Sequence, residues 1–192
     1  MPKRKSRALA LDDLPDLFTL HERHYGFYQP FCEMAADAAS VSLARHHKGT
    51  NCLVDISRGD KVRTRRKLNW RPPSARAKAS LANPDDATRD GAYAIAAATV
   101  EVELGLFVIS RMDVRTGADY FIGEPGQDLE EAHRLEVSGT HLPSHDVRSR
   151  LARKVRQLLH GDSDLPAYAC VAGFKVKEIA LSGVVTKEQK KT

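Results

Sequence analysis

Two carboxylates in the middle of the chain are spaced in a way that suits a catalytic or metal-binding site. Asp119 and Glu136 each lie in a short run typical of a β-strand, and a turn rich in Gly, Pro and acidic residues separates the runs. This pattern predicts a β-hairpin that brings the two side chains together. Oxygen ligands of this kind suit Mg²⁺ or Mn²⁺, so we expect a divalent-metal site. An Asp and a Glu on neighbouring strands also occur in hairpins without chemistry, and that alternative stays open.

The elements that must position this pair follow in a clear order from residue 85 onward. Apolar residues at spacings of three and four predict a long helix over 85–111. Two strands around 114–122 and 133–137, a basic helix over 146–161 and one or two strands beyond 165 complete the order. We therefore expect an α/β fold with an α-β-β-α-β core.

Glu103 is a third acidic residue in an unusual position. It falls on the apolar face of the predicted helix, between Val100 and Phe107. A carboxylate on that face is costly unless it is paired, hydrogen-bonded or bound to a cation. Glu103 is therefore the candidate third metal ligand, whereas Glu101 points to another side of the helix. The alternative for Glu103 is a helix-edge residue that reaches solvent.

The N-terminal part predicts helices followed by a basic β-hairpin. A helix is expected from residue 14 and another over about 30–47, and a period-two pattern over 51–70 predicts the hairpin. Residues 71–84 then carry no apolar face and are predicted to form a linker. The basic face of the hairpin and the residue that follows it are the candidate phosphate-binding positions: Arg63, Arg65, Lys67 and Arg71.

Charge is distributed unevenly along the chain. The net charge is +5, but residues 1–80 hold 16 Lys and Arg against 8 Asp and Glu, residues 81–146 hold 4 against 13, and residues 147–192 hold 10 against 4. Basic surface attracts phosphate, and an acidic pocket can hold a metal ion. The layout indicates DNA or RNA as partner; ordinary solvated loops and tails are the alternative.

Composition limits the remaining choices. A chain of 192 residues with 42% hydrophobic content suits one globular core with an appendage. We expect N-terminal helices, hairpin and linker over 1–84, the core over 85–181 and a flexible tail over 182–192. Three widely spaced cysteines without a CxxC pair argue against disulfides and thiolate zinc sites. No run is apolar enough to cross a membrane, so a cytoplasmic location is expected.

The predicted order and its acidic residues resemble the PD-(D/E)XK nuclease-like superfamily, also called restriction-endonuclease-like, over residues 85–181. The positions that match its motif are Asp119 in GADYFIG, Glu136 in RLEVSG and a helix acid, Glu103 or Glu101. The resemblance implies a metal-dependent phosphodiesterase, that is, a nuclease, which uses Mg²⁺ or Mn²⁺ to cleave nucleic acid.

One position departs from the pattern of that superfamily. Its motif lysine lies two residues after the second acid, and this chain has Ser138 there. A hydroxyl cannot supply the missing charge. Lys154 from the following helix is the first candidate to replace the lysine in space, and Arg134 on the same strand is the second, although a guanidinium does not act as a base at neutral pH.

Two further interpretations remain open at the level of sequence. The fold can persist without catalysis, which would leave a nucleic-acid-binding or assembly module. Such a module would tolerate Asp119→Ala and lose affinity when Arg63, Arg65 or Lys67 is changed. The chain can also act as a homodimer or as a subunit of a larger complex.

Overall fold

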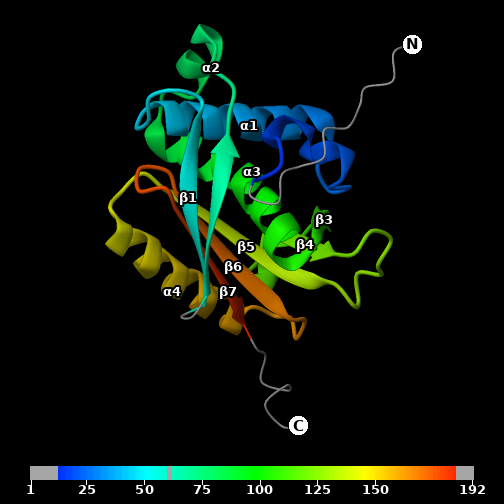
Figure 1. The fold of residues 1–192 in the computed structure, drawn as a ribbon. Coiled ribbons are helices and arrows are strands. Elements are labelled where there is room, and N and C mark those ends of the chain that lie inside the picture. Colours follow the sequence, from blue (N-terminus) through cyan, green and yellow to red (C-terminus); the bar gives the residue numbers. More distant parts are fainter. Residues whose placement is uncertain (1–12, 60–61, 185–192) are drawn as a thin grey trace, which may run out of the picture.

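The computed structural model describes residues 13–59 and 62–184 and shows a mixed α/β architecture with one seven-stranded sheet (Figure 1). The predicted α/β class is confirmed. The elements in chain order are η1 (Leu17–Glu22), α1 (Gln29–Ala44), β1 (Asn51–Arg58), β2 (Val62–Asn69), α2 (Ala75–Ser80), α3 (Pro84–Leu104), β3 (Phe107–Arg111), η2 (Val114–Thr116), β4 (Tyr120–Gly123), β5 (His133–Thr140), α4 (Ser144–His160), β6 (Ala167–Gly173) and β7 (Glu178–Val184).

The strands are ordered β2-β1-β7-β6-β5-β4-β3 across the sheet. Strands β3, β4 and β5 form an antiparallel meander, and β5 then pairs with β6 in parallel. A parallel pair needs a long crossover connection, and α4 provides it here. Strand β7 pairs with β6 in antiparallel fashion and with β1 in parallel, so the N-terminal hairpin extends the same sheet.

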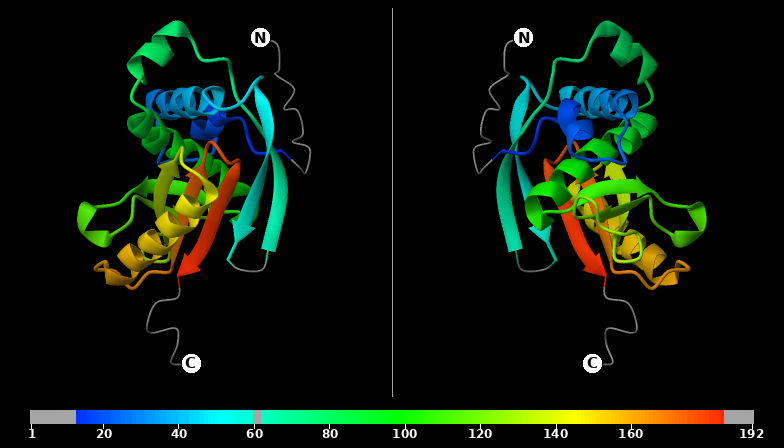
Figure 2. Two further views of the ribbon diagram at one scale, coloured as in Figure 1. Left: turned by 90° about the vertical axis from the view of Figure 1, so that its left-hand side faces the viewer. Right: turned by 90° about the vertical axis from the view of Figure 1, so that its right-hand side faces the viewer.

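Helices cover both faces of the centre of the sheet. Helices α1 and α3 pack on each other, with α3 on β5 and β6, while α4 packs on β5, β6 and β7 from the other face (Figures 1 and 2). Helix α3 approaches α1 closely through Gly91, where a Cβ would lie 2.6 Å from the backbone nitrogen of Ala39. Small residues along this contact therefore allow the two helices to form one layer.

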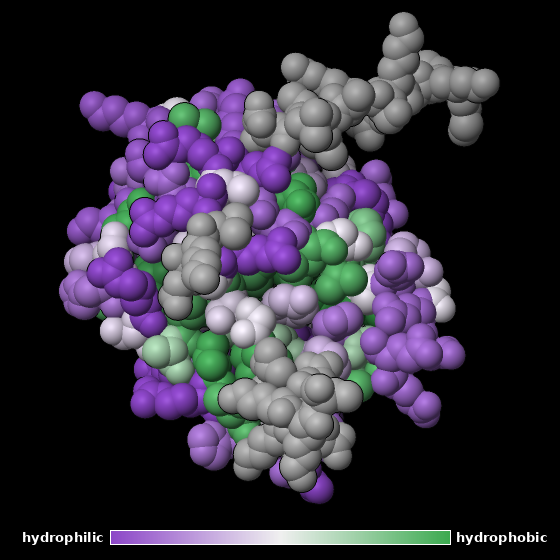
Figure 3. Space-filling model, turned by 60° about the horizontal axis from the view of Figure 1, so that its bottom comes forward, coloured by the Kyte–Doolittle hydropathy of each residue, from purple (hydrophilic) through white to green (hydrophobic). Residues whose placement is uncertain are grey.

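The basic hairpin is present and stands at the edge of the sheet (Figure 2). Asp55 in β1 pairs with Arg65 in β2, and the alternation places Leu68 in the core. Arg63, Arg65 and Lys67 are exposed on the other face, as expected from the period-two pattern. Hydrophilic side chains gather around the end of this hairpin in the space-filling view (Figure 3).

The long helix ends earlier than predicted. Helix α3 stops at Leu104 because Gly105 adopts the left-handed conformation at φ 68°, where a glycine costs little. Residues Phe107–Arg111, which were expected to continue the helix, form β3 against β4. The core order is therefore helix, three strands, helix and two strands.

Several other boundaries also differ from the expectation. The predicted linker contains α2, which Ser74 caps by accepting a hydrogen bond from the backbone nitrogen of Ala77. The first predicted helix is the short 3-10 helix η1, and the strand expected over 114–122 is reduced to β4 with η2 before it. Strand β7 continues to Val184, so residues 182–184, which were expected to belong to a flexible tail, lie in a strand. The rest of the expected tail, like residues 1–12, lies outside the described part.

Two expectations from composition agree with the structure. The three cysteines Cys32, Cys52 and Cys170 are free thiols. Among residues 13–59 and 62–184, no helix has the length and apolar character needed to span a membrane.

Candidate active site

The site lies where β5 has an open edge. Strand β4 pairs with β5 only at Tyr120↔Leu135, Phe121↔Arg134 and Ile122↔His133, whereas β5 continues to Thr140. A cleft of about 470 Å³ lies along this edge, between the N-terminal half of α3 and the flank of α4. Its size is in the range of ligand pockets. The residues that line it are Asp85, Asp86, Thr88, Arg89, Tyr93, Asp119, Val137, Ser138, Gly139, Arg150 and Lys154.

Asp119 lies one residue before β4 and bridges the two sides of the cleft. Its Oδ2 accepts a hydrogen bond of 2.8 Å from the backbone nitrogen of Val137, a donor on the open edge of β5. Its Oδ1 accepts a hydrogen bond of 3.3 Å from the Tyr93 hydroxyl on α3. Burial and the charge of Asp119 raise the pKa of Tyr93, so the phenol stays a neutral donor.

Glu136 lies beside Asp119 on β5, and only 3% of its surface is exposed. Lys154 on α4 donates a hydrogen bond to Oε1 of Glu136 and forms an ion pair with it. Burial and the neighbouring Asp119 raise the pKa of Glu136 to about 7, and the contact with Lys154 opposes part of this shift. Two neighbouring carboxyl groups repel each other when both are ionised, and a bound proton or cation reduces this repulsion.

The donor set fits a hard divalent ion. Asp119 and Glu136 supply carboxylate oxygens, and Val137, whose backbone nitrogen contacts Asp119, also lines the cleft. Mg²⁺ is commonly bound by one or two carboxylates together with water and substrate phosphate. In the part of the chain that the structure describes, no group of three or more His, Cys, Asp or Glu residues is arranged to hold a metal ion. The carboxylate pair would therefore be the whole acidic ligand set.

The rim of the cleft carries both signs of charge. Arg150 on α4 donates to Asp146 Oδ2 at 2.6 Å, and this contact fixes its position. Arg89 on α3 pairs with Asp86 and Asp90 at 3.0 and 2.9 Å. Three cationic side chains, counting Lys154, therefore line the cleft, and Arg89 and Arg150 are paired with acidic residues of their own helices.

Of the two cations considered for the motif-lysine position, Lys154 contacts Glu136 and Arg134 does not. Arg134 is 1% exposed, and its guanidinium donates to the carbonyl oxygens of Leu165, Thr116 and Leu158 at 3.0, 3.1 and 3.3 Å. It holds the end of α4 and the following loop together. Ser138 lines the cleft but carries no charge.

The structure does not bring Glu103 to this site, so its assignment as a metal ligand is wrong. Glu103 accepts hydrogen bonds from Thr64 Oγ1 at 3.0 Å and Arg66 Nε at 3.2 Å, on the inner face of the hairpin. The physical reason is helix length: ten residues separate it from Tyr93, which contacts Asp119, and that spans ~15 Å along the axis. Glu103 can lie on the apolar face of α3 because it forms a buried ion pair with Arg66 of β2.

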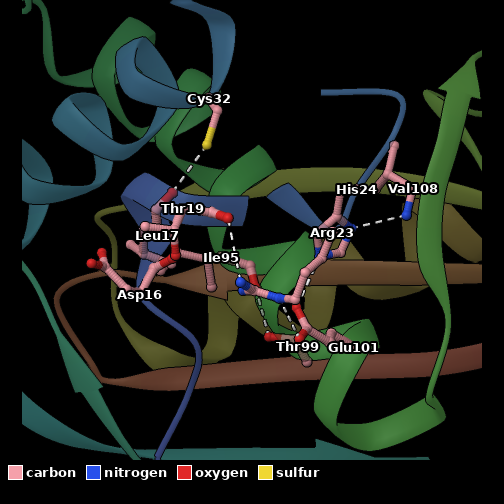
Figure 4. A network of polar contacts seen from close by, with 10 residues as sticks. All are labelled: Asp16, Leu17, Thr19, Arg23, His24, Cys32, Ile95, Thr99, Glu101 and Val108. Atoms are coloured by element: carbon pink, nitrogen blue, oxygen red, sulfur yellow. Dashed lines mark hydrogen bonds and ion pairs between the residues drawn. The ribbon is translucent and has the colours of Figure 1, made fainter. Parts of the chain in front are cut away.

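Glu101 belongs to a separate structural network (Figure 4). Its carboxylate accepts from Arg23 Nε at 2.8 Å and bonds to His24 Nε2 at 3.0 Å. Burial raises the pKa of Glu101, but these hydrogen bonds outweigh burial and hold the pKa below its ordinary value. His24 Nδ1 accepts from the backbone nitrogen of Val108 at 2.9 Å, so Nε2 carries the proton. This network joins the first loop, α3 and β3.

The predicted nucleic-acid residues are exposed, but two of the four have intramolecular partners. Arg65 forms a two-pronged contact with Asp55 at 2.7 and 3.3 Å. Arg71 stacks over the Phe18 ring at 3.9 Å and reaches Asp16 at 3.4 Å. Arg63 and Lys67 lie on the same exposed face as Arg65.

Sequence reasoning placed Asp85 and Asp86 at the start of the long helix, but it assigned neither these acids nor Tyr93 to the site. The available signal was the cluster of Asp85, Asp86 and Asp90 beside Arg89, which precedes the apolar run of residues 91–100. Comparison of the chain with protein-family models, with curated proteins and with solved structures found no match to any of them.

Proposed function

We propose that the protein is a metal-dependent phosphodiesterase that cleaves nucleic acid, with Asp119, Glu136 and Lys154 as its catalytic residues. One observation carries the proposal: the buried Glu136 lies beside Asp119 and contacts Lys154, and both of these neighbours line the cleft of about 470 Å³ at the open edge of β5. The order of elements around the pair supports it, since Glu136 lies on β5 and Asp119 directly precedes the antiparallel neighbour β4, between helices α3 and α4.

The residues divide the work of phosphodiester hydrolysis. Asp119 and Glu136 would hold Mg²⁺ or Mn²⁺, and such an ion supplies Lewis-acid chemistry by polarising phosphate and lowering the pKa of bound water. Water adds to phosphorus, the bond to one ester oxygen breaks, and the proton from water ends on the leaving alcohol. The Lys154 ammonium lies where it can offset the negative charge that grows on the phosphate oxygens. Tyr93 and the Val137 amide orient Asp119.

The basic surface supports nucleic acid as the substrate. Arg63 and Lys67 are exposed on the hairpin, and Arg63 borders a groove of about 290 Å³ with Arg148 of α4. Cations that are spread over such a surface bind phosphates without reading sequence.

The test is cleavage of labelled single- and double-stranded DNA and RNA with Mn²⁺, Mg²⁺ or EDTA. Asp119→Asn is the better variant, because an amide oxygen still accepts from Val137 while the charge is lost. We expect metal-dependent cleavage that falls on the order of 100-fold in this variant. Glu103→Gln is the matched control, since it removes an acid of α3 that lies away from the cleft, and it should cleave as the wild type does.

A second candidate function is binding without cleavage. The specific observation in its favour is that Lys154 already neutralises Glu136, while Ser138 supplies no charge. In that case no substrate would be cut with any metal, and Asp119→Asn would bind nucleic acid as tightly as the wild type. Loss of affinity would instead follow from changes at Arg63 and Lys67.

A further inference from the structure

An exposed aromatic stack leads away from the cleft. Tyr28 is 68% exposed and stacks on Phe31 of α1, with ring centroids 6.4 Å apart and planes inclined by 23°. A single exposed ring is ordinary, as Tyr25 shows, whereas Tyr28 is stacked on a second ring that belongs to α1. The stack therefore offers a flat surface that another planar ring can extend.

Aromatic contacts connect this stack to Asp119. The Phe31 ring lies 6.0 Å from the Tyr93 ring, and the Tyr93 hydroxyl donates to Asp119. The guanidinium of Arg111, on β3, lies 5.4 Å from the centre of the same Tyr93 ring and 5.2 Å from that of Tyr120. Arg111 is exposed, so a cation borders the path between the stack and the acids.

The stack is held by the fold. Tyr28 is the N-cap residue of α1, and the loop before it packs on β3 through Gly26. The Gly26 nitrogen donates to the Val108 carbonyl at 3.0 Å, and a Cβ at Gly26 would lie 2.9 Å from the backbone of Ile109 and Ser110. A fixed platform loses little conformational entropy when a ligand binds.

We propose that Tyr28 and Phe31 form a stacking platform for unpaired bases, and that Arg111 contacts the phosphate between the platform and the cleft. This inference rests on the proposed function, in which the cleft is the place of cleavage, and it specifies the substrate as a single strand or an unpaired end. Bases within a duplex are already stacked on each other and cannot extend the Tyr28 ring, whereas every unpaired base has a free face. Asp90 on α3 forms an ion pair with Arg89 at 2.9 Å.

The test is binding rather than cleavage, so that it does not depend on the metal site. Fluorescent single-stranded DNA, single-stranded RNA and the matching duplexes are titrated with protein in EDTA. We expect Tyr28→Ala to weaken single-strand binding roughly tenfold or more and to leave duplex binding within twofold. Tyr28→Phe keeps the ring and should bind as the wild type does. Tyr25→Ala is the matched control, because Tyr25 is 91% exposed in the same loop and has no ring contact within the described residues.

A second measurement tests the role of Arg111. Arg111→Gln should lower the slope of log affinity against log salt for single strands by about 0.7, as expected for one lost phosphate contact. Tyr28→Ala should leave that slope unchanged, because stacking releases no counterions.

The outcomes separate this inference from the proposed function. Single-strand binding that is unchanged in Tyr28→Ala would overturn the platform even if the protein cleaves. Binding that is weakened equally for single strands and duplexes would overturn it as well. Loss of single-strand affinity in Tyr28→Ala supports the platform even if no cleavage occurs with any metal, in which case only the proposed function fails. Unaltered thermal unfolding of each variant shows that the fold is intact.

Discussion

At the scale of single residues, the main feature of the site is the repulsion between two neighbouring carboxylates. Glu136 is buried beside Asp119, and one ammonium, from Lys154, contacts it. Two carboxylates and one lysine leave a net negative charge at an edge of the sheet that is open to solvent on one side. A proton, a divalent ion or a phosphate bound through such an ion would complete the balance.

The first prediction concerns the stability of the metal-free protein. The pKa of Glu136 is raised from its ordinary 4.5 to about 7. The native state therefore keeps a proton that the unfolded chain has released, and stability falls as pH rises from about 4.5 through 7. Glu136→Gln has no such titration. The unfolding free energy of the variant minus that of the wild type should therefore be larger at pH 8 than at pH 5, by on the order of 1–3 kcal/mol. Urea unfolding of both proteins in EDTA at pH 5 and pH 8 measures this difference. The prediction is contradicted if the unfolding free energies of the two proteins change equally between the two pH values.

The second prediction separates metal binding from catalysis at Lys154. Lys154→Met removes the ammonium that competes for Glu136, so Mn²⁺ should bind at least as tightly as in the wild type. Cleavage should nevertheless fall on the order of 100-fold, because the charge that offsets the transition state is lost. Calorimetric titration of Mn²⁺ and the cleavage rate are measured on the same sample. Loss of both properties would mean that Lys154 only maintains the fold.

At the scale of elements, the cleft exists because β4 is short and α3 is held close to β5. Gly139 permits this approach: a Cβ there would overlap the Thr88 carbonyl oxygen and lie 2.8 Å from its carbon. Helix α3 then presents Tyr93 to Asp119 with one half of its length and Glu103 to the hairpin with the other.

The third prediction follows from this contact. Gly139→Ala should destabilise the protein by about 1–3 kcal/mol, since backbone has to shift to admit the methyl group, and it should widen the cleft and reduce cleavage. Gly183→Ala in β7 is the control, because its Cβ would meet only the edge of Tyr168 at 3.4 Å. Thermal unfolding of the two variants gives the comparison, and equal melting temperatures would rule out the close approach of α3.

The fourth prediction concerns the other end of α3. Glu103→Ala breaks the buried contact with Arg66 and Thr64 and should cost roughly 2–4 kcal/mol of stability. Cleavage per folded molecule should not change, because the residue lies away from the acids. Denaturant unfolding and activity below the unfolding transition are the two measurements. A loss of cleavage per folded molecule would contradict this prediction and would support Glu103 as a metal ligand.

At the scale of the whole molecule, the separation of charge along the chain becomes a separation in space. The acidic middle segment supplies Asp119 and Glu136, and the basic first segment supplies the outer face of the hairpin. Strand β1 joins the two parts by pairing with β7 within a single sheet. The hairpin is therefore held in a fixed relation to the cleft.

The fifth prediction tests the hairpin as a phosphate-binding surface. The double change Arg63→Gln and Lys67→Gln should weaken nucleic-acid binding for every sequence and reduce the slope of log affinity against log salt by about 2. Arg76→Gln with Lys78→Gln on α2 is the control pair, which also removes two exposed cations. Titrations at several salt concentrations give both slopes. Equal effects of the two pairs would show a general charge effect instead of a defined surface.

The sequence determined the features that depend on local pattern. Period-two alternation identified the hairpin and its exposed cations. The Gly/Pro-rich turn identified the two neighbouring strands, with Glu136 on β5 and Asp119 one residue before β4. The end of α3 was missed because Phe107–Arg111 is apolar enough to continue a helix, and only Gly105 and pairing with β4 decide otherwise.

Tertiary structure alone decided which side chains share the site. Periodicity places a residue on a face of its own helix, but not against a particular neighbour along an axis of ~30 Å. Because α3 crosses β5 near its own start, Tyr93 and not Glu103 contacts Asp119. The packing of α4 brings Lys154 to Glu136, whereas Arg134 donates its hydrogen bonds to backbone carbonyls. Burial and the approach of two carboxylates, which raise the pKa of Glu136, arise only when separate elements come together.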